Sequence, residues 1–599
     1  MVEGNEMRIL SLMRAGLTRR QLLRGMGLSV AAVATTGLLA ACETDDDDAA
    51  SDDAAPAAES DDSDDEVEVE TDDTEEMVDD EDDHEDDDHD DEDHDDNHDH
   101  DDDEPTVDGD RPNLVIAAAG IPGQLDPYSN RSLVGHMTQY SIFETLVRRD
   151  WLDSDPPGIG NNIVPMLADS WEYLDDMTIE FHLRDDVTWH NGDHFDADDV
   201  VYSFESLIGE EVPEWAGAQQ DMTNLESVEK IDDYTVQLVT NVPDPIFLTN
   251  LAAISSYIIP HEYYEEVGME EFGLNPVGTG PYRVVAYTPD EVIQLESHDD
   301  YWMGMPNAAT VEFRVIPETS ARVSALVSGE VHIATNIPPD QIQTLEEADG
   351  VHPESIESLN FHMIRFNTLN ETMTDNRLRQ AMCYAIDREL LVDTLWFGDA
   401  RVPNGHQFID YPDHLFFDDV TLPYDPDRAQ ELLEEAGYDD ELITFRVHPT
   451  YYTGYADAAQ AIVQMWQEVG INAELELTET PWDAGDDAMV HNWSNSSNMA
   501  DPLGAIWTNW GPGSPSQANF WDAPERFNEL GQELGSTLDD DERSELWREM
   551  LELWMEERPG TPLYNPLETY GVSDMIDWKP IAVPYMDLRN YNLNFSSED

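Results

Sequence analysis

The sequence contains very little cysteine and almost no lysine. Its two cysteines, Cys42 and Cys383, cannot form an intramolecular disulfide if Cys42 is modified. Lys230 and Lys579 are the only lysines, and 27 basic residues in all face 134 acidic ones, for a formal net charge of −107. This shortage of positive charge excludes nucleic-acid binding, because such proteins neutralise phosphates with lysine and arginine.

The sequence also lacks the short motifs of common hydrolases. It contains neither Gly-x-Ser-x-Gly nor His-Glu-x-x-His. Carboxylates are so numerous that no single pair of them indicates acid–base catalysis. We therefore expect a binding protein with no catalytic residues and no cofactor, and a secreted hydrolase is the remote alternative.

The first 42 residues have the features of an export signal. Arg19-Arg20 precede an uncharged apolar run at 25–41, and adjacent arginines before such a run are typical of a twin-arginine signal. Leu39-Ala-Ala-Cys42 matches a lipobox, so we expect Cys42 to carry lipid and to begin the mature protein. This predicts an exported protein, lipid-anchored on the outer face of the cytoplasmic membrane and facing the periplasm or the cell exterior. A transmembrane anchor is the alternative.

Residues 43–110 form an acidic segment of low complexity. They include 41 Asp or Glu and no Lys or Arg. Such a segment buries too little apolar surface to offset its ordering entropy, so we expect a disordered tether extended by self-repulsion. Binding of divalent cations by the tether is a weaker hypothesis, and it rests on five irregularly spaced histidines: His84, His89, His94, His98 and His100.

The remaining body, 111–599, is strongly acidic in its own right. Of the 134 acidic residues 91 lie in it, and of the 27 basic residues 22 do, so its net charge is near −69. Such a surface repels itself until salt screens it. This composition resembles that of halophilic exported proteins, and we expect the body to unfold at low salt.

The clearest local pattern lies at 164–207. Apolar and polar residues alternate from Met177 to Leu183, which predicts a strand with one buried face. Asn191-Gly192 predicts a tight turn. Asp196 is a candidate N-cap for a helix whose apolar residues recur at helical spacing: Val200, Val201, Phe204 and Leu207.

This stretch resembles the signature region of the family 5 extracytoplasmic solute-binding proteins, the peptide and nickel receptors of ABC importers. The resemblance rests on four motifs in the family's order: Leu167-Ala-Asp-Ser-Trp171, Phe181-His-Leu-Arg-Asp185, Trp189-His-Asn-Gly192 and Phe195-Asp-Ala-Asp-Asp-Val200. It implies an α/β fold, namely the two-lobed periplasmic-binding-protein fold of type II in its large three-domain peptide-binding variety.

The resemblance also implies the domain organisation of the body. We expect lobe I at 111–365 and 566–599, with a subdomain at 150–245, and lobe II at 366–565. The hinge is expected near 360–370 and 560–570. Such a receptor captures di- or oligopeptides in the cleft between its lobes and delivers them to a membrane permease whose partner subunit hydrolyses ATP. We expect it to act as a monomer.

The family's ligand contacts imply a site around 482–501. Trp482 and Trp493 match the tryptophan of peptide-binding members, with core packing as the alternative. An acidic residue that pairs with the peptide's α-ammonium is expected nearby, but Asn498 stands three residues before Asp501. Either Asp501 takes this role or the ligand lacks a free amine. The missing acid and the tether histidines keep a nickel or metal-chelate receptor open as the alternative.

Three further residues complete the predicted site. Tyr128 and Arg131 belong to a segment that faces the ligand in the family, and Arg131 could pair with a ligand carboxylate. A solvated surface arginine is the alternative for Arg131. Tyr564, on the returning segment, is a weaker candidate of the same kind as the tryptophans.

Overall fold

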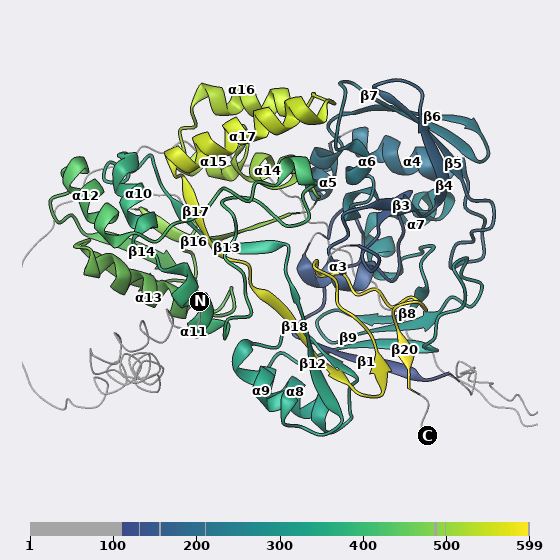
Figure 1. Ribbon diagram of the computed structural model, residues 1–599. Coiled ribbons are helices and arrows are strands. Elements are labelled where there is room, and N and C mark those ends of the chain that lie inside the picture. Colours follow the sequence, from purple (N-terminus) through teal and green to yellow (C-terminus); the bar gives the residue numbers. More distant parts are fainter. Residues whose placement is uncertain are drawn as a thin grey trace, which may run out of the picture. The chain divides into compact units, whose positions relative to one another are not determined.

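The computed structural model describes residues 111–130, 132–154, 157–209, 211–483, 488–497 and 499–596. They lie in one unit of the chain, Val107–Asp599, which contains three main β-sheets surrounded by helices (Figure 1). The predicted lipidation site, Cys42, and the five tether histidines lie outside the described residues.

The largest sheet has seven strands in the order β12-β18-β11-β1-β10-β9-β8. The central strand β1 (Asn113–Ala118) runs parallel to both of its neighbours. Helices α8 (Thr319–Val327) and α9 (Pro339–Glu346) bury Leu326 and Leu345 against it. The other strands are β8 (Tyr282–Thr288), β9 (Val292–Ser297), β10 (Thr310–Val315), β11 (Ile333–Ala334), β12 (Val351–Glu357) and β18 (Leu567–Ser573).

A four-stranded antiparallel sheet contains the stretch with the clearest sequence pattern. Its order is β4-β5-β7-β6, with β4 at Ala168–Tyr173, β5 at Thr178–Leu183, β6 at Leu225–Asp232 and β7 at Thr235–Thr240. On β5, Ile179, Phe181 and Leu183 are buried, so the predicted strand is confirmed. Asp196 caps helix α4 (Ala197–Ile208) in a capping box with Asp199, which confirms the predicted helix start.

The third sheet has five strands in the order β15-β14-β16-β13-β17. The side chains of β13 alternate between two cores, because Phe361 and Met363 join one hydrophobic cluster whereas Ile364 and Phe366 join another. This sheet is therefore covered on both faces. Its strands are β13 (Asn360–Phe366), β14 (Ile443–Val447), β15 (Ala473–Leu477), β16 (Val490–Ser496) and β17 (Gly560–Tyr564).

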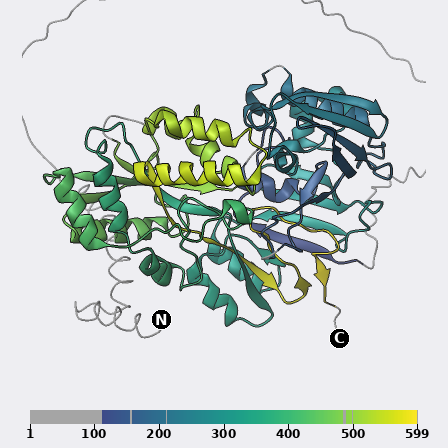
Figure 2. The same ribbon diagram turned by 45° about the horizontal axis from the view of Figure 1, so that its top comes forward.

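Helices surround the five-stranded sheet, with α16 and α17 side by side above it in Figures 1 and 2. Helix α10 holds Cys383, which is buried. The helices of this region are α10 (Asn376–Tyr384), α11 (Arg388–Leu395), α12 (Pro426–Ala436), α13 (Tyr455–Glu468), α14 (Ile506–Trp510), α15 (Pro515–Phe520), α16 (Glu525–Leu534) and α17 (Asp540–Glu557).

The remaining α-helices and strands lie outside these groups. They are α3 (Leu133–Gln139), α5 (Ala216–Asp221), α6 (Phe247–Asn250), α7 (His261–Leu274), β2 (Val147–Arg149), β3 (Ile163–Pro165), β19 (Ile576–Asp577) and β20 (Asn594–Phe595). Among the helices in the described ranges, none has the length and apolarity needed to span a bilayer.

The chain passes between the seven-stranded and five-stranded sheets twice. It crosses between Glu357 and Asn360, and it returns between Tyr564 and Leu567. The strand pairing thus puts β13 wholly in the five-stranded sheet, and the lobe boundary at 365 stays a prediction. A buried ion pair between Arg149 Nη2 and Asp410 Oδ2, at 2.7 Å, joins the β2 region to the irregular segment between α11 and α12.

Candidate functional site

The parallel strands of the five-stranded sheet define one edge where polar and aromatic loops meet. β14 runs parallel to both β15 and β16, so the carboxyl ends of these strands lie at the same edge. In open α/β sheets, ligands bind outside the carboxyl ends of the strands. The segments that leave this edge, 448–454 after β14 and 478–483 after β15, are therefore the first place to look for a ligand site.

These two segments and β16 bring five aromatic side chains together, which we call the aromatic patch. The Trp482 ring lies at its centre, 5.0 Å from the Tyr451 ring and 6.4 Å from the Trp493 ring between centroids, both edge to face. The remaining members stack on Trp482 or pack beside it: His448, at 5.7 Å and nearly parallel, and Tyr452, at 6.5 Å.

The aromatic patch is anchored to the sheet and open to solvent. The Trp482 indole N–H donates a hydrogen bond to the Asn492 carbonyl oxygen at 2.8 Å, and the Ser494 hydroxyl donates to the Tyr452 hydroxyl at 3.1 Å. Tyr451 keeps 63% of its surface exposed, and the other four residues are partly exposed. The patch thus offers fixed rings to an apolar or aromatic group.

A buried arginine supports the patch from behind. The Arg365 guanidinium on β13 lies over the Trp493 ring on one side and the Phe520 ring on the other. It donates hydrogen bonds to His491 Nε2 and to the Ser516 hydroxyl, and no carboxylate of the described residues lies within 4.0 Å of it. Burial lowers the pKa of the Arg365 guanidinium to about 9.

The structure brings together the two predicted tryptophans but separates Tyr564 from solvent. Tyr564 ends β17 and is fully buried, with its ring 5.3 Å from the His362 ring. His362 in turn packs against Tyr452 at 5.1 Å. Tyr564 therefore lies below the patch and supports it without facing the surface. Arg131 and Asn498 lie outside the described residues.

Asp501 does not offer a free carboxylate, which corrects the role given to it from the sequence. It is 6% exposed, and its Oδ2 lies 2.5 Å from Arg543 Nη2. Its other oxygen accepts a hydrogen bond from the Leu503 amide. Burial raises the pKa of the Asp501 carboxyl, and Arg543 opposes this shift. The Asp501 carboxylate thus stabilises the segment 502–504, and its charge is already paired with that of Arg543.

Tyr128 is likewise a core residue, which corrects its predicted contact with a ligand. Its side chain is fully buried, its hydroxyl donates to the Tyr257 carbonyl oxygen at 2.7 Å, and its ring packs edge to face on Trp215. A tyrosine with a satisfied hydroxyl and no exposed surface has no group left for a ligand.

Four residues of the site are not among those predicted from the sequence. His448, Tyr451 and Tyr452 lie in an irregular loop, where no hydrophobic period marks them. The one available signal is the run His-Pro-Thr-Tyr-Tyr directly after an alternating strand pattern. Arg365 lies inside an apolar strand, and its burial between two aromatic rings depends on residues far along the chain.

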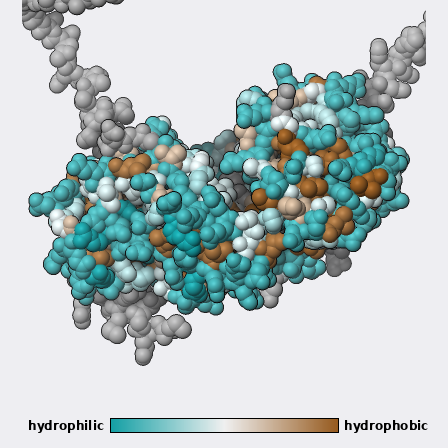
Figure 3. Space-filling view, turned by 90° about the horizontal axis from the view of Figure 1, so that it is seen from above, coloured by the Kyte–Doolittle hydropathy of each residue, from teal (hydrophilic) through white to brown (hydrophobic). Residues whose placement is uncertain are grey.

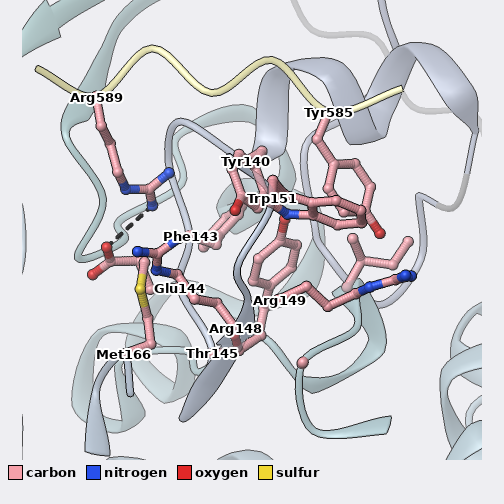
Figure 4. A pocket seen from close by; sticks show the side chains of 13 residues that line it. Tyr140, Phe143, Glu144, Thr145, Arg148, Arg149, Trp151, Met166, Tyr585 and Arg589 are labelled. Carbon is pink, nitrogen blue, oxygen red and sulfur yellow. Dashed lines mark hydrogen bonds and ion pairs between the residues drawn. The ribbon is translucent and has the colours of Figure 1, made fainter. Parts of the chain in front are cut away.

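A small cavity near the seven-stranded sheet has room for about one water molecule. Its volume is about 10 Å³, and three arginines, Arg148, Arg149 and Arg589, contribute to its lining (Figure 4). Glu144 Oε1 lies 3.2 Å from Arg589 Nη2. Arg148 and Arg149 are neighbours on β2 and point to opposite faces, so they do not converge on one ligand. This cavity is too small for a peptide.

One group of side chains among the described residues has the composition of a metal site. Ligand atoms of Glu172, Glu180 and His182 lie within 4.8 Å of one another on the outer face of the four-stranded sheet. Two of the three residues are exposed. This group is remote in sequence from the tether histidines on which the metal hypothesis rests.

Comparison with known proteins places the chain among solute receptors. Residues 162–525 match the model of the bacterial extracellular solute-binding proteins, family 5. Di/tripeptide-binding protein 3 of Pseudomonas aeruginosa is 27% identical over 502 residues, covering 76% of this chain and 91% of that protein.

Two solved structures share the fold. One is the periplasmic binding protein DppA of Helicobacter pylori in complex with the peptide STSA, with a TM-score of 0.68 at 23% identity, covering 81% of this chain and 98% of the other. The second is NikZ of Campylobacter jejuni in complex with Ni(L-His), with a TM-score of 0.66 at 20% identity, covering 78% and 96%.

Proposed function

Because the chain belongs to the family 5 bacterial extracellular solute-binding proteins, we propose that it is the receptor of an ABC importer and captures di- or oligopeptides. The observation that carries this proposal is the aromatic patch at the carboxyl edge of the five-stranded sheet. The peptides bound by DppA and named for the Pseudomonas relative support the ligand class. The receptor itself performs no catalysis.

The patch suits a peptide because it combines ring faces with hydroxyl groups. Tyr451 and Trp482 meet edge to face and leave ring surface for an apolar side chain of the ligand. The Tyr452 hydroxyl, fixed by Ser494, can exchange hydrogen bonds with a backbone amide of the ligand. The surface seen from above is hollowed near its middle, between the end with α12 and the end with β4 and β5 (Figure 3). Such a hollow would admit an extended ligand.

Delivery to the permease requires a second state of the receptor. A ligand that contacts both sides of a cleft favours the closed arrangement by its differential affinity. The two crossings near 358–359 and 565–566 are where the backbone would bend. Lipid at Cys42 and the acidic tether would hold the body close to the membrane, where the permease and its ATPase subunits lie.

A receptor for nickel chelates is the second candidate. The observation that favours it is that Asp501, the acid expected to pair with a peptide ammonium, is paired with Arg543 instead. The aromatic patch also contains an imidazole, His448, whose Nε2 lies 2.9 Å from the exposed Glu479 carboxylate. NikZ, which shares the fold, binds Ni(L-His).

Thermal unfolding of the full chain in about 2 M salt separates these candidates. The ligands are di- and tripeptides, free amino acids, and nickel with and without histidine. A ligand that binds only the folded state raises the unfolding midpoint by mass action. We expect peptides to raise it. A rise with nickel–histidine and none with peptides would overturn peptide capture in favour of chelate uptake, and a response to none of them would overturn both.

A further inference from the structure

Most cations in the described part of this protein are paired with carboxylates. In the part of the chain that the structure describes, five arginines have no carboxylate within 4.0 Å: Arg148, Arg322, Arg365, Arg388 and Arg558. Arg322 and Arg388 donate to backbone carbonyl groups instead, and Arg365 donates to His491 and Ser516. Only Arg148 and Arg558 among these five keep a buried Nε without a hydrogen-bond partner.

Arg558 is the more informative of the two, because it lines a space that can hold a ligand. It follows α17 as the C-cap, in the left-handed region with φ of 50°, and is 7% exposed. Its Nη1 lies 3.2 Å from the Met555 sulfur, a weak acceptor that does not compensate the charge. A buried cation without an anion is unfavourable, so this site is poised to accept a negatively charged group.

The space beside Arg558 is a groove of about 300 Å³ between α10 and α17, which we call the α10–α17 groove. Val420, Leu551 and Met555 give it an apolar wall, and Tyr384 contributes a ring. Its volume is at the lower end of the range for small-molecule sites. Its lining shares no residue with the aromatic patch, so an occupant would not compete directly with the transported ligand.

We propose that the α10–α17 groove binds a small carboxylate that carries a short apolar chain. The carboxylate would accept a hydrogen bond from the part of the Arg558 guanidinium that lines the groove, since arginine matches carboxylate geometry. The apolar chain would lie against Val420 and Leu551. The exposed Glu552 and Glu556 at the groove repel a polyanion, which restricts the ligand to a single negative charge. The inference does not depend on the proposed function.

Titration calorimetry of the full chain in about 2 M salt tests this proposal with 4-methylpentanoate as the probe. We expect binding of 4-methylpentanoate, and at least tenfold weaker binding of its neutral amide. Equal binding of acid and amide, or no binding of either, would overturn the proposal. Leucine, which adds an ammonium group, distinguishes two ligand classes. If leucine binds as strongly as 4-methylpentanoate, the groove also accepts amino acids and peptide C-termini. If leucine binds more weakly, the groove is restricted to simple carboxylates.

Two variants locate the bound acid. Arg558→Met should weaken binding at least tenfold, and it leaves the backbone cost of the left-handed position unchanged because neither residue is glycine. Arg428→Met, at a partly exposed arginine on α12 paired with Glu431 and Glu435, is the control that should not change it. If Arg558→Met does not fold, Val420→Trp fills the groove from the opposite wall. Binding unchanged in Val420→Trp would overturn the proposal.

Discussion

The guanidinium carbon of Arg365 lies 3.8 Å from the centroid of the Trp493 ring. On its other side the same carbon lies 4.0 Å from the Phe520 ring, so the cation is held between two aromatic faces. A desolvated cation–π contact of this kind contributes about 2 kcal/mol. The contact fixes the orientation of a tryptophan that lies on the surface of the aromatic patch, and so connects the buried sheet to the proposed ligand site.

Replacing Arg365 with methionine should therefore weaken ligand binding about three- to tenfold, since Trp493 loses the group that holds it. The unfolding free energy should fall by less than the lost contacts with Trp493 and Phe520 would suggest. The reason is that the variant also removes a buried cation that has no carboxylate partner. Tryptophan fluorescence titration with the ligand identified by thermal unfolding gives the affinity. Phe520→Leu, which alters the face of the cation away from Trp493 and the contact with the His491 ring, is the matched control and should leave affinity within about twofold. An equal loss in both variants would assign the effect to general loosening of the core.

Removing the exposed ring of the patch should affect binding without affecting folding. Tyr451→Ala deletes a side chain that is 63% exposed, so the unfolding free energy should change by less than about 0.5 kcal/mol. Loss of its ring contact should weaken ligand binding by about 1 kcal/mol, or about fivefold. Tyr173→Ala is the control, because it removes the ring of another exposed tyrosine, 56% exposed, on β4 and outside the aromatic patch. Calorimetric affinities that fall equally in both variants would contradict the assignment of the patch.

Some of these features follow from local sequence and others do not. The alternation at 177–183 and the cap at Asp196 depend on neighbours within a few residues, and both were predictable. Gly192 adopts φ of 92° in the turn that Asn191-Gly192 predicts. Asp501 was misjudged because its partner, Arg543, lies 42 residues further along. Tyr128 was misjudged because a motif alone does not tell which side of a segment faces the core.

The ion pair between Asp501 and Arg543 gives a direct test of the corrected role of Asp501. Asp501→Asn leaves a buried guanidinium uncompensated and should lower the unfolding free energy by about 3–5 kcal/mol. Ligand affinity of the folded fraction should stay the same, whereas loss of an ammonium partner would lower it. Urea unfolding and calorimetry measure the two quantities.

The double variant Asp501→Leu with Arg543→Met supplies the control for that experiment. It removes both charges, so it should be less destabilised than Asp501→Asn. Arg543 also donates to the Leu534 carbonyl oxygen at the end of α16, and the double variant loses this contact as well. A double variant at least as destabilised as the single one would show that the helix contact, rather than the ion pair, holds this region.

Acid should destabilise the protein through buried histidines. His406 is fully buried, and its Nε2–H donates a hydrogen bond to Asn495 Oδ1 at 2.8 Å. Burial lowers the pKa of its imidazole to about 4. The pKa in the unfolded chain is about 6.5, so between pH 6.5 and 4 the unfolded state binds a proton that the folded state does not. The unfolding free energy therefore falls as pH falls through this window, by about 3 kcal/mol from this one group.

His406→Gln should flatten that pH dependence, because glutamine can still bond to Asn495 but does not titrate. Urea unfolding at fixed salt between pH 7 and pH 4.5 measures the slope. Parallel curves for wild type and His406→Gln would show that other groups account for the acid sensitivity.

Salt should stabilise the body mainly by screening its own charge. The net charge of 111–599 is near −69, and most of the described cations already have carboxylate partners. Further reduction of the repulsion among carboxylates must therefore come from dissolved salt. The Debye length shortens from about 10 Å at 0.1 M to about 3 Å at 1 M, so most of the gain in unfolding midpoint should appear below about 1 M potassium chloride. Circular dichroism during dialysis to about 10 mM salt should show loss of helix signal, reversible on adding salt and not restored by sucrose, which does not screen charge. An unchanged spectrum at low salt would mean that packing of the three sheets outweighs the repulsion, and the acidic surface would then serve solubility rather than salt-dependent folding.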